Sequence, residues 1–466
     1  MTLTATSLST AASKTDLQQL AVDVVERALR AGATEAEAVI REGDEFSTVV
    51  RLGQVETLKE SGARGIGLRV FLGSPGSFRT ANTSTSDFSE AGLAHLISGA
   101  IDLARVTSED PFAGLPEREA MGEIAGDLDL FYEDVYGLPT SQRIDYARRA
   151  EAAALAADPR LTKSDGGSFD AATGHRIMAN SRGFVGEYRR SYCSISAMPI
   201  AEAEQGGMQR DYWFSSARTL ARLDSPESVG AEAARRTLRR LNGRRVATQQ
   251  VPIVFAPEVA RSLIGNVFEA ANGDSIYRSA SFWTGQLGQQ VASKNVTVID
   301  DGTLPGLFGT APFDGEGLPT RRTVIVENGV LKNYLLNTYT GRKLNMPSTG
   351  NASRALAGTP GIGGGNLFLQ NGTISVQQLL ADVKTGFYVT EMMGFGVNMV
   401  TGDYSRGAAG LWIENGELAF AVEEVTIAGN LKEMLNHVTA IANDLEFRGA
   451  VASPTVRIDG MTIAGK

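Results

Sequence analysis

Residues 411–420 read Leu411-Trp412-Ile413-Glu414-Asn415-Gly416-Glu417-Leu418-Ala419-Phe420. Two runs of strand-forming residues flank the Asn-Gly pair, and this dipeptide favours the tight turn of a β-hairpin because both residues readily adopt a positive φ. The same signal recurs at Asn328-Gly329, between the runs 322–327 and 330–336. Such hairpins predict antiparallel strands in the second half of the chain.

The pattern of the chain changes near residue 245. Short strand-like runs bounded by Gly dominate after it, whereas helix and strand patterns alternate before it. We therefore predict an α+β fold, with an N-terminal α+β domain over residues 15–245. A C-terminal β-rich domain over 246–466 is expected to form an antiparallel barrel or sandwich. Residues 1–14 are rich in Ser, Thr and Ala, lack the basic start and apolar core of a signal peptide, and predict a disordered tail.

The first half begins with an amphipathic pattern. Apolar residues recur every three or four positions from Asp16 to Gly32, which predicts a helix with one buried face. Periodic apolar residues predict further helices after Ser86 and from Ser141. Strand-like segments separated by Gly, Asp and Ser lie between them at 36–41, 46–52, 65–72 and 76–82. The first half is thus predicted to pack helices against short strands.

Composition limits the classes of function. The 466 residues carry a formal charge of −9 with a pI near 5.2, which argues against a general affinity for nucleic acid or for an anionic membrane surface. No apolar run approaches the roughly 20 residues that span a bilayer. The single cysteine, Cys193, cannot form an intramolecular disulfide, and a protein of this size without one is typical of the cytoplasm.

The sequence contains none of the short motifs that mark common catalytic or metal sites. HExxH, HExxxH, CxxC and GxSxG are all absent. The three histidines, His95, His175 and His437, are far apart in the sequence, and each is expected to be structural. The Gly-rich run 358–366 matches neither of the common phosphate-binding patterns and favours a flexible loop. The residues by themselves therefore predict no catalytic centre.

One stretch, 390–408, interleaves Gly and polar residues with strand-forming ones more densely than plain packing requires. We expect it to form exposed strands and tight turns beside a cleft, where another chain can pair with its edges. Its candidates for contacts with a peptide or a partner are Glu391, Asn398, Asp403 and Arg406. The alternative is a Gly-rich hairpin in which Asp403 and Arg406 pair locally and only brace that hairpin.

The same stretch resembles the TldD/PmbA family, and in particular its PmbA (TldE) branch. The resemblance rests on residues 389–391, 396–398 and 400–408, and it continues through 412–417, 422–431 and 443–446. Weaker similarity covers nearly the whole chain and includes Asp314-Gly315-Glu316-Gly317 and 348–352. The resemblance implies an N-terminal α+β domain, a C-terminal β-rich domain, and a heterodimer with a TldD-type subunit that acts on unfolded or leader peptides.

In the TldD branch, a helix with the motif HExxxH and a later cysteine bind zinc, and the Glu of the motif is the expected general base. In this chain the corresponding helix is 259–272, which puts Ile264 and Glu269 at the two histidine positions and Gly265 at the base. No cysteine follows Cys193. The resemblance therefore implies no catalytic residue, metal site or cofactor in this chain, with zinc in the partner subunit.

Together these observations favour a non-catalytic, metal-free subunit of a TldD/TldE-type heterodimeric zinc metallopeptidase, which helps to enclose and bind an extended peptide. The expected partners are a TldD-type subunit with the HExxxH motif and the peptide, with neither nucleic acid nor membrane. Two alternatives stay open. In the first, the chain is a self-sufficient homodimeric hydrolase that uses unrecognised carboxylates. In the second, it is a regulatory binding protein.

Overall fold

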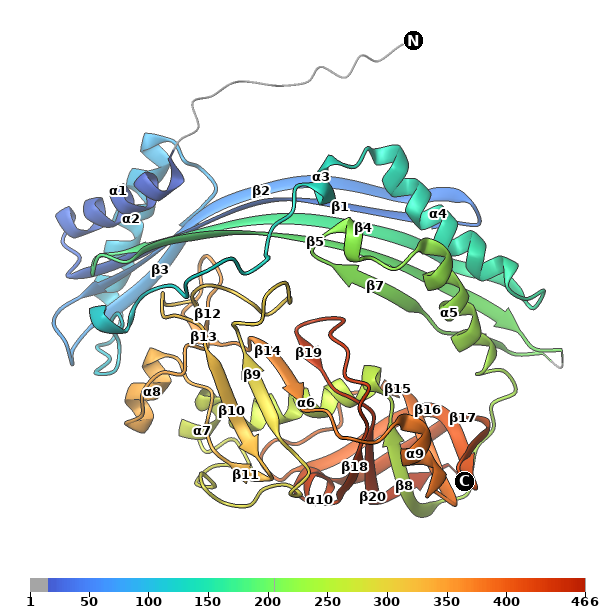
Figure 1. Cartoon of the computed structure of the whole chain (residues 1–466). Helices are drawn as coiled ribbons and strands as arrows, with labels where there is room; N and C mark the ends of the chain where they lie inside the picture. The colour runs from blue at the N-terminus through green and yellow to red at the C-terminus, as the bar shows by residue number, and fades with distance from the viewer. Residues whose placement is uncertain (1–15, 205, 466) are drawn as a thin grey trace, which may run out of the picture.

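The computed structural model describes residues 16–204 and 206–465. Its N-terminal half is one large antiparallel sheet in the order β3-β2-β1-β4-β5-β6, and β7 also pairs with β5. The four longest strands form a strongly curved arch (Figure 1). The strand bounds are β1 (Glu35–Arg51), β2 (Gln54–Leu72), β3 (Arg79–Thr85), β4 (Leu161–Asn180), β5 (Val185–Glu202), β6 (Met208–Arg210) and β7 (Trp213–Ala217).

Helices cover the convex face of the arch at its two ends (Figure 1). At one end, a core that includes Val24, Leu93 and Ile66 joins the first two helices to the sheet. At the other end, Ala150 and Val229 belong to the core beneath the later helices. The helices are α1 (Leu17–Arg30), α2 (Glu90–Val106), α3 (Asp134–Gly137), α4 (Thr140–Ala156) and α5 (Pro226–Leu238). Apolar periodicity thus places α1, α2 and α4 where the sequence predicts helices.

Neither helix group covers the middle of the convex face (Figure 1). Polar side chains lie there, and the ring nitrogens of His175 are 3.2 Å from Glu42 Oε1 and 3.0 Å from Glu187 Oε2. The predicted break between the strands 36–41 and 46–52 is wrong, because β1 runs without interruption through this region. The polar residues between the two segments do not mark a turn. They occupy the part of the strand that has no helix above it.

The C-terminal half contains two sheets, in the orders β11-β10-β9-β14-β19 and β17-β16-β15-β8-β20-β18. Because β17 also pairs with β20, the strands β8, β15, β16, β17 and β20 close into a five-stranded barrel. The strand bounds are β8 (Gln249–Phe255), β9 (Val298–Asp301), β10 (Arg322–Glu327), β11 (Val330–Leu331), β12 (Ala352–Ser353), β13 (Gly361–Ile362), β14 (Asn366–Leu369), β15 (Thr385–Met393), β16 (Asp403–Glu414), β17 (Glu417–Asn430), β18 (Val438–Ile441), β19 (Val451–Ala452) and β20 (Val456–Ala464). The helices are α6 (Pro257–Ala271), α7 (Gly273–Tyr277), α8 (Thr338–Leu344), α9 (Val376–Ala381) and α10 (Leu431–Asn436). The α+β fold class with a β-rich barrel in the second half is therefore confirmed.

Both Asn-Gly turns adopt the backbone conformation that the sequence predicts. Asn415 and Gly416 have φ values of 50° and 85° between β16 and β17. Asn328 and Gly329, between β10 and β11, have φ values of 48° and 81°. The boundary proposed between residues 245 and 246 falls between the end of α5 and the start of β8, and the division into domains stays a prediction. None of the described helices is long and apolar enough to cross a lipid bilayer.

The C-terminal half lies under the concave face of the arch (Figure 1). Phe313 packs edge-on against Phe184, the residue before β5, and against Tyr188 of β5, with ring centroids 5.2 and 5.3 Å apart. Val39 and Met178 complete this buried cluster from the sheet side. An apolar contact between the halves therefore fixes one wall of the space between them.

A loop of the C-terminal half also packs closely against the face of the sheet. Arg354 places its Nη1 2.9 Å from Oε1 of Glu37, and both side chains are fully buried. Arg69 Nη1 lies 3.2 Å from the same oxygen. Two residues further along the loop, the carbonyl oxygen of Leu356 comes so close to Gly67 that a Cβ on that glycine would lie 1.8 Å from it. Gly67 is therefore required for the loop to reach the sheet.

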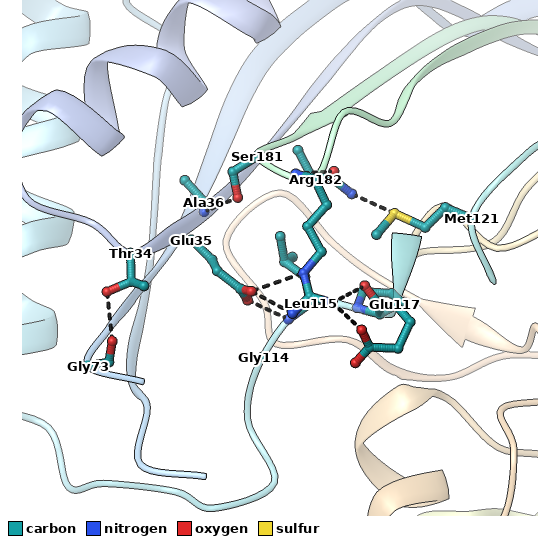
Figure 2. A network of polar contacts seen from close by, with 12 residues as sticks. Thr34, Glu35, Ala36, Gly73, Gly114, Leu115, Glu117, Met121, Ser181 and Arg182 are labelled. Carbon is teal, nitrogen blue, oxygen red and sulfur yellow. Dashed lines mark hydrogen bonds and ion pairs between the residues drawn. The ribbon is translucent and has the colours of Figure 1, made fainter. Parts of the chain in front are cut away.

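A polar network fixes the long connection between α2 and α3 (Figure 2). Arg182 donates through Nη2 to Glu35 Oε1 at 2.6 Å and through Nη1 to Glu117 Oε2 at 2.8 Å. The backbone N–H of Leu115 donates to Glu35 Oε2 at 3.0 Å. Arg342 of α8 donates to the carbonyl of Leu115 at 2.7 Å. The connection is thus held both by the sheet and by the C-terminal half.

Candidate functional site

A cleft separates the concave face of the N-terminal sheet from loops of the C-terminal half. It consists of a cavity of about 330 Å³ on the sheet and an adjoining cavity of about 200 Å³ toward the loops. Arg176, Tyr188 and Arg190 line both cavities. The loop side is formed by residues within 308–315, 350–353 and 363–365. The Gly-rich run that the sequence predicts to be a loop therefore contributes to the cleft.

Buried carboxylates lie on the loop side of the cleft. Asp314 accepts hydrogen bonds from the backbone N–H groups of Glu316, Leu318 and Ala352, at 2.8, 3.0 and 2.9 Å. Glu316 Oε2 accepts one from the N–H of Thr338 at 2.8 Å. Burial, followed by the nearby charge of Asp314, raises the pKa of Glu316. The structure thus brings together 314–317 and 348–352, two segments that carry the family resemblance. Asp314 and Glu316 hold the surrounding loops through these hydrogen bonds.

Asp300 is the third buried acid at the cleft. It accepts hydrogen bonds from Asn351 Nδ2 and from the N–H of Gly365, both at 2.7 Å. Burial nevertheless raises the pKa of Asp300 to about 6, because these two hydrogen bonds only partly offset the loss of water. This carboxyl group therefore binds its proton more tightly in the folded protein than in the unfolded chain.

We expect the free energy of unfolding to depend on pH through Asp300. A folded pKa above the unfolded value means that the stability from this group is complete at acid pH and is lost as pH rises through about 6. Between pH 5 and pH 8, the free energy of unfolding should therefore fall by ~1–2 kcal/mol less in the Asp300→Asn variant than in the wild type. Urea unfolding at both pH values measures the difference. If the free energy of unfolding changed equally between the two pH values in both proteins, the raised pKa of Asp300 would be contradicted.

The structure places the four predicted contact residues along β15, β16 and the loop between them. Glu391 on β15 forms an ion pair with Arg240, at 2.5 Å between Oε2 and Nη2. Asn398 Oδ1 accepts hydrogen bonds from the N–H groups of Val400 and Thr401, at 2.9 and 3.2 Å. Asn398 thereby shapes the loop, whereas Glu391 joins the barrel to the segment after α5.

Among the described residues, Asp403 contacts neighbouring residues of the barrel and not Arg406, and the choice between the two interpretations stays open. Asp403 accepts hydrogen bonds from Thr401 Oγ1 at 2.7 Å and from Asn430 Nδ2 at 3.2 Å, and these bonds lower its pKa. Residues three apart in a strand point to opposite faces. Arg406 accordingly lies on the side of the buried Tyr404, and its Nε has no hydrogen-bond partner within the described residues.

The loop between β15 and β16 exposes apolar side chains that the sequence analysis did not select. Phe395 and Val400 of the loop are 99% and 58% exposed, and Met393 at the end of β15 is 46% exposed. A Cβ on Gly396 would lie 2.0 Å from the carbonyl oxygen of Ser405, and the N–H of Ser405 donates to Gly396 at 2.7 Å. The close backbone pairing therefore holds the loop, while Phe395 points into solvent. The position of Phe395 between Gly394 and Gly396 is the sequence signal that could have identified this exposed side chain.

Comparison with known proteins identifies the family that shares this arrangement. Three models of PmbA/TldA metallopeptidase match the chain: domain 1 at residues 36–104, the central domain at 133–241 and the C-terminal domain at 248–465. A metalloprotease PmbA from Escherichia coli O157:H7 is 38% identical over 431 residues, which is 92% of each chain. The chain belongs to the PmbA/TldD family. The family resemblance inferred from residues 389–408 is therefore confirmed.

Solved structures of similar proteins share the whole architecture. A protein from Bacteroides thetaiotaomicron, described as a candidate modulator of DNA gyrase, superposes with a TM-score of 0.87 at 26% identity. The match covers 97% of this chain and all of that one. TldE from Thermococcus kodakarensis has the same fold, with a TM-score of 0.83 at 20% identity over 95% and 99% of the two chains.

Helix α6 contains the positions that the resemblance predicts to correspond to the HExxxH motif. Ile264 is 4% exposed and belongs to the C-terminal core, whereas Glu269 is exposed on the other side of the helix. Neither Ile264 nor Gly265 has a side-chain atom that could bind a metal ion or accept a proton, so these positions do not fit a zinc site. In residues 16–204 and 206–465, no group of three or more His, Cys, Asp or Glu is placed to hold a metal. The assignment of these positions stays a prediction.

Proposed function

We propose that this chain is the non-catalytic, zinc-free subunit of a heterodimeric metallopeptidase of the TldD/TldE type, which acts on unfolded or leader peptides in the cytoplasm. The observation that carries the proposal is the composition of α6. The helix is well formed and buried in the core, yet Ile264 and Gly265 stand where the motif needs a metal ligand and a base. Family membership supports the peptidase activity, and α6 supports placing its chemistry in another subunit.

The loop between β15 and β16 supports a partner subunit. An aromatic side chain as exposed as Phe395, beside two further exposed apolar residues, is characteristic of a protein interface. Asn398 and Asp403 hold the turn that carries it through their hydrogen bonds with Thr401. We assign to these two residues the positioning of the interface. Glu391 and Arg406 stay candidates for contacts with the peptide or the partner.

Reconstitution with a TldD-type homologue that contains HExxxH tests the proposal. We expect the two chains to elute as one complex in size-exclusion chromatography at micromolar concentration, with zinc in the homologue and none in this chain. The complex should cleave an unfolded peptide, and this chain alone should not. Two separate elution peaks would exclude the heterodimer. Cleavage by this chain alone would favour the self-sufficient hydrolase instead.

A further inference from the structure

The concave face of the sheet presents three arginines around a floor of glycine. Strand register puts Arg41 directly opposite Arg176, and Arg176 opposite Tyr188. Two positions along β4, Gly174 lies opposite Arg190. A Cβ on Gly174 would lie 3.3 Å from Nε of Arg190, so the Arg190 side chain lies across the strand at this glycine. All of these residues line the cavity of about 330 Å³.

None of the three guanidinium groups forms an ion pair with a described residue, although the charge of Asp314 is close enough to act on Arg176 and Arg41 donates to the carbonyl oxygen of Arg354. Nε and Nη2 of Arg176 are buried and have no hydrogen-bond partner within the described residues. Among the residues that the structure describes, Arg190 has no partner for an ion pair or a side-chain hydrogen bond. Burial, followed by the charge of Arg176 and then by that of Arg190, lowers the pKa of Arg41. Like charges opposite each other on neighbouring strands repel, and an anion between them would remove the repulsion.

The nearby acids are oriented away from these arginines or committed elsewhere. The oxygens of Asp314 accept three backbone N–H groups of their own loop. Glu42 also borders the cavity, but its Oε1 lies 3.2 Å from Nδ1 of His175 and forms no ion pair with these arginines. Glu45 lies on the concave face, but it is exposed and sits four residues further along the strand. The cavity is thus a positively charged site that opens to solvent.

We propose that this cavity binds a carboxylate of an extended peptide, between Arg176 and Arg190. Guanidinium groups match the two oxygens of a carboxylate, and charge-assisted hydrogen bonds of this type are strong in a partly dry cleft. Gly43 and Gly174 leave the strands beneath without side chains, which lets a peptide backbone approach the sheet. The inference rests on the proposed function, because it adds a substrate-binding surface to that subunit.

The test uses the full-length chain and three decapeptides of Gly, Ser and Ala, each labelled at the N-terminus with an uncharged BODIPY dye. One has a free terminal carboxylate, one is amidated, and one is amidated and contains a central Asp. We expect at least one carboxylate peptide to bind about tenfold more tightly than the neutral peptide in fluorescence anisotropy. The better binder of the two identifies a terminal or a side-chain carboxylate. Equal affinities for all three peptides would overturn the proposal, and so would tighter binding of inorganic phosphate.

Two neighbouring arginines provide the matched variants. Arg190→Ala removes a guanidinium group from the cavity and should abolish the tenfold preference. Arg189→Ala makes the same change of net charge on the opposite face, where Arg189 lies 3.7 Å from the ring of Phe131, and should keep the preference. Equal losses in both variants would show a general charge effect and refute the site. Melting temperatures confirm that each variant is folded.

The outcome separates the two proposals because the binding assay does not need a partner. Preferential binding of a carboxylate peptide by a chain that forms no heterodimer would refute only the proposed function. A heterodimer that cleaves peptides, but whose subunit shows no preference for a carboxylate, would refute only the cationic site.

Discussion

The Glu37→Gln variant is expected to unfold with a free energy about 3–5 kcal/mol lower than that of the wild type. Glu37 is fully buried, and its Oε1 lies 3.2 Å from Nη1 of Arg69 and 2.9 Å from Nη1 of Arg354. Glutamine keeps the shape of the side chain but removes the negative charge between two buried guanidinium groups. Each of those groups then loses its ion pair without regaining water, which is the costly way to break a buried pair.

The Arg354→Met variant is expected to lose less stability than Glu37→Gln. Glu37 still pairs with Arg69 in this variant, and methionine fills the space of the arginine stem. Urea unfolding followed by tryptophan fluorescence gives both values. Glu45→Gln, on the same strand but exposed, serves as the control and should stay within about 0.5 kcal/mol of wild type. The reverse order of the two core variants would show that the ion pair is not the main contribution.

The Phe395→Ser variant is expected to weaken the complex with the TldD-type subunit by about 2 kcal/mol or more, which is roughly a 30-fold higher Kd. Phe395 is 99% exposed, so it contributes almost nothing to the fold of the isolated chain. In a complex, the same ring would bury a large apolar area at low entropic cost, as aromatic anchors do. Titration of the labelled partner measures the Kd.

Leu418→Ser provides the matched control for that experiment. Leu418 is 41% exposed on β17 of the same barrel and lies next to the Asn415-Gly416 turn. We expect this variant to bind the partner as the wild type does. If both serine variants bind normally, the loop between β15 and β16 is not the interface. If both bind weakly with lowered melting temperatures, the barrel itself has been damaged.

The parts of the fold that the sequence predicts are those whose determinants lie within a few residues of each other. The turn at Asn415-Gly416 depends on two residues, and the buried face of α1 depends on a repeat of three to four. The continuity of β1 could not be predicted in this way. Its polar centre, 42–45, resembles a turn, and only the absence of a helix above that part of the sheet explains why it is a strand (Figure 1).

The cleft could not be predicted because its residues meet only through strand register. Arg41, Arg176 and Arg190 belong to three strands, and no motif relates them along the chain. The opposite faces of Asp403 and Arg406, by contrast, follow from their spacing once 403–414 is known to be a continuous strand. The pattern of the chain predicts the fold class, and the family resemblance gives the predicted position of the motif helix, but neither of them predicts the cationic site.

The closed barrel also affects how the chain reaches its native state. Phe255 of β8 lies opposite Val389 on one side and Val456 on the other, so neighbouring strands come from distant parts of the sequence. Pairings of this kind form slowly, because a long loop must close before its contacts stabilise it. Until β20 joins β8 and β17, those two strands have free edges, and free edges pair readily with other chains. Incompletely folded copies are therefore expected to aggregate through β8 and β17, which the finished barrel hides.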